Sequence, residues 1–189
     1  MKRAMLIGLL LTSINLLAKD CELTADKGNV NLDWIAFKTE EKLPVKARFK
    51  YLGIPKKIKG NGLADFLTGI SFDIDTTSTS TRNTARDANI VKYFFQKFVG
   101  GMSIKGKTLN LTADKLKVAI TMNKVTKMID LTVKQKGKKI TAKGNVDVLD
   151  FKLSSALESI NKACYALHKG KTWSQVDLVL TIYTDNTCD

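Results

Sequence analysis

The sequence predicts an all-β protein built as an antiparallel barrel with two helices, and three observations support this fold class. Apolar and polar residues alternate in many short segments, which is the pattern of strands with one buried and one solvated face. Short polar or glycine-containing turns separate these segments, as in antiparallel sheets. Only two stretches have the helical spacing of apolar residues. Many short amphipathic strands fit a closed barrel or a sandwich, and we favour the barrel.

Eight segments carry the alternation. In the first, Val30, Leu32, Trp34 and Ala36 are apolar at every second position. The segments cover residues 30–36, 45–51, 70–75, 102–111, 116–122, 129–133, 140–148 and 176–182. Because successive strand residues point to opposite faces, each segment is expected to direct one apolar row into the interior.

The two helices are expected at residues 84–99 and 155–168. The first has an apolar stripe of Ile90, Val91, Phe94, Phe95 and Phe98. Thr84 with Asp87, and Ser155 with Glu158, resemble capping boxes that begin a helix. Gly100 and Gly170 follow the two segments and are typical helix stops.

Residues 1–18 have the pattern of a secretory signal peptide. Lys2 and Arg3 precede an apolar stretch, and Ala18 supplies a small residue for cleavage. An N-terminal membrane anchor is the alternative, but the apolar stretch is shorter than the roughly 20 residues of a membrane span. We therefore expect a periplasmic or secreted protein that begins near Lys19 and forms one domain over residues 19–189.

Charge and cysteine content limit the partners. The net charge is +13, and removing the charges of Lys2 and Arg3 leaves +11. The lysines are scattered and are not interleaved with aromatic residues, so no nucleic-acid partner is expected. In an oxidising compartment Cys21 and Cys188 are expected to form a disulfide, with a Cys21–Cys164 pair left open. Cys164 lies on the apolar stripe of the second helix.

Few residues could support catalysis, so no enzyme, metal or cofactor is expected. Beyond residue 18 the chain has one histidine, His168, at a helix C-terminus, where it meets the helix dipole favourably. Asp73 and Asp75 share a strand face that we expect to be solvated. Arg86 opens the first helix and either pairs with a nearby carboxylate or contacts a ligand head group.

Large apolar side chains on the inward faces and on the first helix are the candidate lumen residues. They are Leu32, Trp34, Phe49, Tyr51, Ile70, Phe72, Ile74, Phe94, Phe95, Phe98, Met102, Ile120 and Met122. A barrel of about eight strands either fills with side chains or holds one small ligand. Periodicity alone leaves these two cases open.

Several segments in order resemble the YceI-like, polyisoprenoid-binding family. They are Gly69-Ile70-Ser71-Phe72-Asp73-Ile74-Asp75-Thr76, Ala85-Arg86-Asp87, Tyr93-Phe94-Phe95 and residues 144–151, while residues 161–173 resemble exported members from ε-proteobacteria. The resemblance implies an extended lipocalin-like barrel of eight antiparallel strands that holds an isoprenoid, quinone or fatty-acid-type molecule. One departure is that many members have a histidine where this chain reads Phe37-Lys38-Thr39.

From this resemblance we expect a lipid-binding protein without catalytic activity, used for transport, storage or sequestration. The expected partner is a long-chain apolar lipid; a transient contact with an anionic membrane surface and a homodimer are left open. The alternative is an envelope stress or protein-interaction factor with a filled barrel. An enzyme acting on a bound lipid is the third and least favoured hypothesis.

Overall fold

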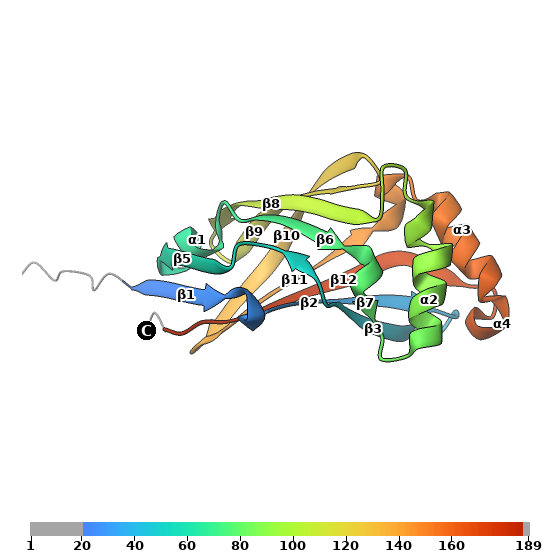
Figure 1. The fold of residues 1–189 in the computed structure, drawn as a ribbon, viewed down its shortest axis with the longest axis horizontal. Coiled ribbons are helices and arrows are strands. Elements are labelled where there is room, and N and C mark those ends of the chain that lie inside the picture. Colours follow the sequence, from blue (N-terminus) through green and yellow to red (C-terminus); the bar gives the residue numbers. More distant parts are fainter. Residues whose placement is uncertain (1–20, 187–189) are drawn as a thin grey trace, which may run out of the picture.

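A ten-stranded antiparallel sheet forms the body of the molecule (Figure 1). The computed structural model describes residues 21–186, so the expected signal peptide and Cys188 lie outside the described residues. In pairing order the strands are β4 (Leu52–Gly53), β6 (Ser71–Asp75), β8 (Ser103–Thr112), β9 (Lys115–Met122), β10 (Val125–Lys136), β11 (Lys139–Asp147), β12 (Thr172–Tyr183), β2 (Val30–Lys38), β3 (Leu43–Phe49) and β7 (Thr79–Ser80). The two edge strands have two residues each, and each of the other eight overlaps one of the eight predicted segments. The all-β, antiparallel prediction is confirmed.

One short connection and two hydrogen bonds show that the sheet is curled. Only Lys50 and Tyr51 separate β3 from β4, although these strands lie near opposite ends of the pairing order. A link of this length spans about 10 Å, whereas a flat sheet would place the two strands about 40 Å apart. The backbone N–H groups of Lys50 and Tyr51 donate to the carbonyl and hydroxyl oxygens of Ser78, at 3.1 and 3.0 Å. The sheet therefore closes into a lipocalin-like barrel through short links between its edges.

A two-stranded sheet and a short helix cover one end of the barrel. These elements are β1 (Glu22–Asp26), β5 (Lys57–Asn61) and α1 (Gly62–Leu67), and none was predicted from the sequence. Leu23, Phe66 and Leu67 are completely buried there. A Cβ on Gly60 would lie 2.2 Å from the Phe66 nitrogen, so glycine allows α1 to pack directly on β5. This end of the barrel is solid.

The larger helices lie at the opposite end of the barrel (Figure 1). They are α2 (Thr84–Tyr93), α3 (Ser154–Ala163) and α4 (Tyr165–His168), and short 3₁₀ turns are η1 (Lys27–Asn29), η2 (Thr76–Ser78), η3 (Phe95–Lys97) and η4 (Val148–Phe151). The prediction of two continuous helices is wrong in detail. The first is interrupted at Phe94 before η3, and the second at Cys164, which is buried.

The predicted capping residues also need correction. Asn83, not Thr84, caps α2, since its side-chain oxygen accepts from the backbone N–H of Arg86 at 2.9 Å. The Asp87 carboxylate instead accepts from the backbone and hydroxyl of Thr81. The N-cap of α3 is Leu153, which has no side-chain capping bond, so Ser155 lies inside the first turn.

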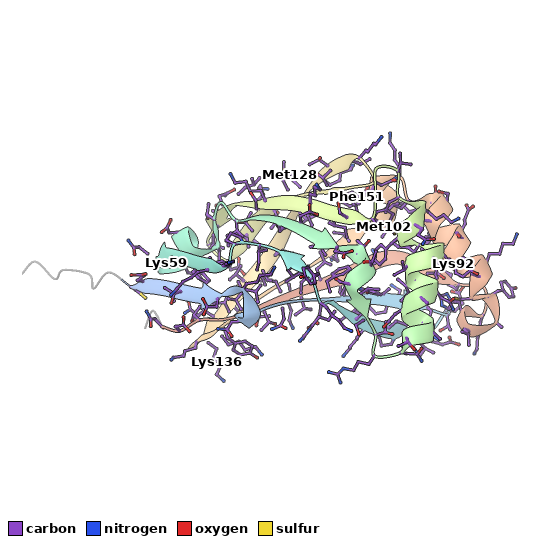
Figure 2. All side chains as sticks on the ribbon, in the orientation of Figure 1. Lys59, Lys92, Met102, Met128, Lys136 and Phe151 are labelled. Carbon is purple, nitrogen blue, oxygen red and sulfur yellow. The ribbon has the colours of Figure 1, made fainter. Side chains whose placement is uncertain are left out.

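Charged side chains cover the outside of the barrel. Figure 2 labels Lys59, Lys92 and Lys136 on three separate elements, β5, α2 and β10, and all three are exposed. Asp73 and Asp75 are exposed as predicted, and Asp73 pairs with Lys105 at 3.1 Å. The positive charge is therefore spread over the surface.

Two further findings concern residues 21–186. No helix among them is long and apolar enough to cross a membrane. Cys164 is a buried free thiol, so the Cys21–Cys164 pair left open above is not formed. Because Cys188 lies outside the described residues, the Cys21–Cys188 disulfide stays a prediction.

Candidate functional site

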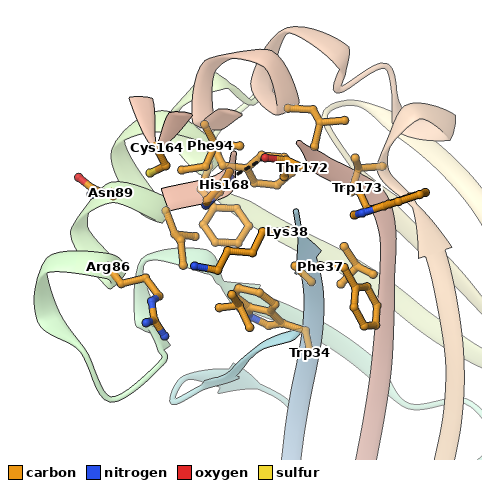
Figure 3. A pocket seen from close by; sticks show the side chains of 18 of the residues that line it. Trp34, Phe37, Lys38, Arg86, Asn89, Phe94, Cys164, His168, Thr172 and Trp173 are labelled. Atoms are coloured by element: carbon orange, nitrogen blue, oxygen red, sulfur yellow. Dashed lines mark hydrogen bonds between the residues drawn. The ribbon is translucent and has the colours of Figure 1, made fainter. Parts of the chain in front are cut away.

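A cavity of about 440 Å³ lies between the inner face of the sheet and the helices α2, α3 and α4 (Figure 3). This volume falls within the roughly 300–1,000 Å³ of pockets that hold one small organic molecule. Its walls are mostly apolar and it is partly open to solvent. The barrel interior is therefore hollow at the helical end.

Five aromatic rings form one wall of the cavity. The Trp34 and Phe49 rings lie 6.4 Å apart between centroids, and Phe49 lies 6.1 Å from Phe95. Phe94, Phe95 and Phe98 contact one another edge to face at 5.4–5.6 Å. Such edge-to-face contacts stabilise aromatic clusters beyond the burial of their area. The segment that follows the helix break at Phe94 thus brings three phenylalanine rings together in one apolar surface.

Both tryptophans of the chain line this cavity. The Trp34 indole N–H donates to the Thr79 hydroxyl at 3.2 Å, and that of Trp173 donates to the Thr39 carbonyl at 2.7 Å. With the indole N–H groups satisfied by the protein, both rings can present apolar surface without an unpaired donor.

A β-bulge in β12 shapes the cavity opening. Thr172 pairs with Lys38 and Val176 pairs with Ala36, so the three residues of β12 between these pairs run beside one residue of β2. Trp173 lies inside this irregular stretch. Bulges of this kind redirect side chains next to binding sites.

A hydrogen-bonded chain holds His168 at the edge of the cavity. The Asn161 amide donates to the Gly170 carbonyl at 3.0 Å and accepts from the Thr172 hydroxyl at 2.9 Å. Because this bond uses the only hydroxyl proton of Thr172, His168 Nδ1 donates to the Thr172 oxygen at 2.7 Å. Burial lowers the pKa of His168, and the nearby Lys38 lowers it further. The imidazole is therefore neutral at pH 7.

Within residues 21–186, the charged side chains that line the cavity are Lys38 and Arg86. No Asp or Glu of this part of the chain lines it. Cys164 also lines the cavity, and burial raises the pKa of its thiol. An activated nucleophilic cysteine requires the opposite shift. No group of residues among 21–186 could hold a metal ion.

The structure brings only some of the predicted lumen residues to the cavity. Trp34, Phe49, Phe94, Phe95, Phe98 and Met122 line it, and Ile74 and Ile120 are buried in the adjoining core. Leu32, Ile70 and Phe72 are half-buried against the core without lining the cavity.

Two predicted lumen residues lie outside. Tyr51 is 67% exposed because it belongs to the link between β3 and β4, and Met102 is 37% exposed because it precedes β8. Phe72 misses the cavity for another reason. A Cβ on Gly106 would lie 2.3 Å from its ring, so the ring occupies the space over that glycine.

The sequence interpretation missed the helical side of the cavity. Leu157, Ile160 and Leu167 of α3 and α4, and Asn89 of α2, line it together with Trp173. The apolar stripe of the second helix was visible in the sequence. Its position over the mouth of the barrel was not, because helix spacing identifies a buried face without saying what that face covers.

Solved structures with this fold were found, although no family model and no curated protein matches the sequence. A polyisoprenoid-binding domain from Saccharophagus degradans, implicated in plant cell wall breakdown, has a TM-score of 0.60 at 13% identity, covering 89% of this chain and 99% of that one. BcnA from Burkholderia cenocepacia has a TM-score of 0.61 at 13% identity, covering 84% and 98%. A YceI protein from Campylobacter jejuni has a TM-score of 0.55 at 17% identity, covering 77% and 86%. The chain has the fold of YceI-like proteins.

Proposed function

We propose that this protein binds one long apolar molecule, of isoprenoid, quinone or fatty-acid type, in the cavity under α2, α3 and α4. The observation that carries the proposal is the hollow interior of about 440 Å³ behind an aromatic wall. Transfer of apolar surface from water into such a cavity gains about 25 cal/mol per Å². The shared fold with a domain named for polyisoprenoid binding supports the same ligand class.

We propose a binding role without catalysis. The cavity offers a thiol whose pKa burial raises and a neutral histidine whose Nδ1 is committed to Thr172. General acid–base or nucleophilic chemistry needs a reactive group with a matched pKa and a hydrogen-bonded partner. Cys164 and His168 do not form such a pair. We infer that the ligand leaves unchanged, as in transport, storage or sequestration.

Export is part of the proposal. It is supported by the signal-peptide pattern of residues 1–18. Expression of the full chain in a Gram-negative host, followed by fractionation and N-terminal sequencing, should give a periplasmic or secreted form that begins near Lys19. Retention of residues 1–18 in a membrane fraction would instead indicate an anchor.

Tryptophan fluorescence tests the ligand proposal directly, because Trp34 and Trp173 both line the cavity. Delipidated protein is titrated with farnesol, and native mass spectrometry of freshly purified protein tests for a co-purified lipid. We expect saturable quenching with one lipid per chain. Non-saturable or absent quenching would contradict the proposal.

A cavity-filling variant supplies the matched comparison. Ala36 lines the cavity between Trp34 and Lys38, so Ala36→Phe should abolish the saturable fluorescence change. Ala163 on α3 is exposed and does not line the cavity, so Ala163→Phe should leave binding unchanged. Equal binding by both variants would mean that lipid binds elsewhere.

A further inference from the structure

We propose that the cavity selects a lipid with an anionic head group, a carboxylate or a phosphate, which Arg86 and Lys38 bind at the mouth while the tail lies along the aromatic wall. This inference rests on the proposed function, and it narrows the ligand class. The sequence had left Arg86 between a structural ion pair and a ligand contact.

The charge of the lining is one-sided. Arg86 and Lys38 carry positive charge, His168 is neutral, and no carboxylate lines the cavity within residues 21–186. Two uncompensated cations beside a largely apolar volume attract an anion, because the low polarity of the walls strengthens the interaction.

A few cations on the outer surface of the barrel have carboxylate partners. Arg48 forms a two-pronged pair with Asp33 at 2.6 and 2.9 Å, and Lys117 lies 3.3 Å from Asp130. These pairs lie on the outer surface, where solvent screens them and their contribution to stability is small. Most lysines of residues 21–186 have no such partner, so Arg86 and Lys38 are distinguished by their position in the lining of an apolar cavity.

Arg86 has no carboxylate partner among the described residues. Its neighbour Asp87 accepts two hydrogen bonds from Thr81, at 2.6 and 2.7 Å, and the Asn83 side chain caps the backbone N–H of Arg86. A guanidinium has five N–H donors in a planar fork that fits a carboxylate or phosphate. Arg86 is exposed and also lines the cavity, so it lies where the cavity meets solvent.

Lys38 reaches the cavity from β2 and is held by a hydrogen bond to α4. Its ammonium donates one hydrogen bond, 3.2 Å long, to the Leu167 carbonyl of α4, and an ammonium has three donors. In Figure 3 the Lys38 side chain extends from β2 toward the side of the cavity where Arg86 of α2 lies. Lys38 also lowers the pKa of both His168 and Cys164, so its positive charge acts on groups that line the cavity.

The strand periodicity sets the spacing between the residues that would contact the head group of the ligand and those that would contact its tail. Trp34, Ala36 and Lys38 lie on the same face of β2 and all line the cavity. Four residues of strand span about 13 Å. A ligand whose anion meets Lys38 can therefore place its first carbons beside Ala36 and its further carbons against the ring of Trp34.

Paired ligands that differ only in charge test the proposal. Delipidated protein is titrated at neutral pH with farnesyl monophosphate and with farnesol, and separately with myristate and with myristamide, using the tryptophan fluorescence. The first pair tests a phosphate and the second a carboxylate. We expect the anion of at least one pair to bind about 10- to 100-fold more tightly than its neutral partner, the gain typical of charge-assisted hydrogen bonds.

Two matched variant pairs locate the effect. Arg86→Gln and Lys38→Gln should each weaken binding of the anion about tenfold and change binding of the neutral partner less than about twofold. Arg82→Gln and Lys46→Gln remove the same charge at exposed positions outside the cavity lining, and they should leave both affinities unchanged. An equal loss in all four variants would indicate general attraction to a basic protein and would overturn the proposal.

His168 gives a readout that needs no substitution. It is the only histidine of the chain, and within the site it faces Lys38, Cys164 and the neutral Asn161 and Thr172. A bound anion should raise its pKa in an NMR titration, because a nearby negative charge favours the imidazolium. A neutral ligand removes water without adding charge and should leave the pKa equal or lower.

The outcomes separate this inference from the proposed function. Saturable binding of farnesol and myristamide with the same affinity as their anions, and no rise of the His168 pKa, would overturn the anionic selectivity and leave lipid binding intact. If no ligand of either pair changes the tryptophan fluorescence, both proposals fail.

Discussion

The two ends of the barrel are built from the same alternating strands but are filled differently. At the end covered by β1, β5 and α1, Leu23, Phe66 and Leu67 are completely buried. At the end covered by α2, α3 and α4, inward-facing rings such as Trp34 and Phe94 border a cavity of about 440 Å³. The strand pattern does not distinguish these ends, so the covering elements decide which one is hollow.

The covering elements differ in how deeply they enter the barrel. Gly60 lets the backbone of α1 approach β5 so closely that Phe66 and Leu67 fill the interior. At the other end α2 and α3 lie over the mouth (Figure 1), and their side chains Ile90 and Leu157 line the cavity of about 440 Å³. The short helix α1 therefore completes a packed core, whereas α2 and α3 leave a cavity beneath them.

The largest effect should come from removing a ring at the solid end. Phe66→Ala should lower the free energy of unfolding by about 3–5 kcal/mol, the usual cost of a new cavity in a packed core. Phe94→Ala should cost less than half of that, because this half-buried ring already borders an empty volume. Urea denaturation of the two variants measures both values, and equal costs would mean that the ends are packed alike.

The next effect concerns the close approach of α1. Gly60→Ala places a Cβ 2.2 Å from the Phe66 nitrogen, and we expect a loss of about 1–3 kcal/mol in the free energy of unfolding. A Cβ on Gly28 would have no other atom within 4 Å, so Gly28→Ala is the matched control. It should be neutral or slightly stabilising, since alanine restricts the unfolded chain. A neutral Gly60→Ala would mean that α1 does not seal this end.

A smaller effect should appear in the reactivity of Cys164. Its thiol is buried, lines the cavity and has a pKa raised by burial, and the thiolate is the reactive form. Alkylation of native protein, mapped by mass spectrometry, should be slower than in urea, and a saturating lipid should slow it further. Unchanged alkylation with saturating lipid would place the lipid outside this cavity.

The smallest effect should be a pH dependence of stability from His168. Burial lowers the pKa of His168 in the folded protein below its ordinary value of 6.5, so the unfolded chain binds more protons near that pH. Stability should therefore fall as the pH drops below about 6.5 and level off below the folded pKa. Urea denaturation across this range should show a shallower slope for His168→Gln. An identical slope would mean that His168 is not desolvated.

Much of the fold was predictable because strand alternation is a local property. All eight predicted segments became strands, and Asp73 and Asp75 lie on the solvent side as expected. The covering elements were harder to predict. The apolar positions of β1, β5 and α1 are too few to show a period, and Phe66 becomes a core residue only through the contact with Gly60.

The candidate site was predictable only in its strand and aromatic part. Trp34, Phe49 and the phenylalanines after α2 were expected to point inward, and they line the cavity. Trp173 was missed because a bulge in β12 interrupts the regular pattern. Arg86 and Lys38 come from different elements, and only the closure of the barrel brings them to one cavity.

The sequence by itself determined which residues form strands and which face of each strand is apolar, because alternating side chains impose this on the neighbouring backbone. Only the tertiary structure decided whether the inward side chains meet or surround a space. That outcome depends on the circumference of the closed sheet and on how far the covering helices enter it, and both are set by residues distant in the chain.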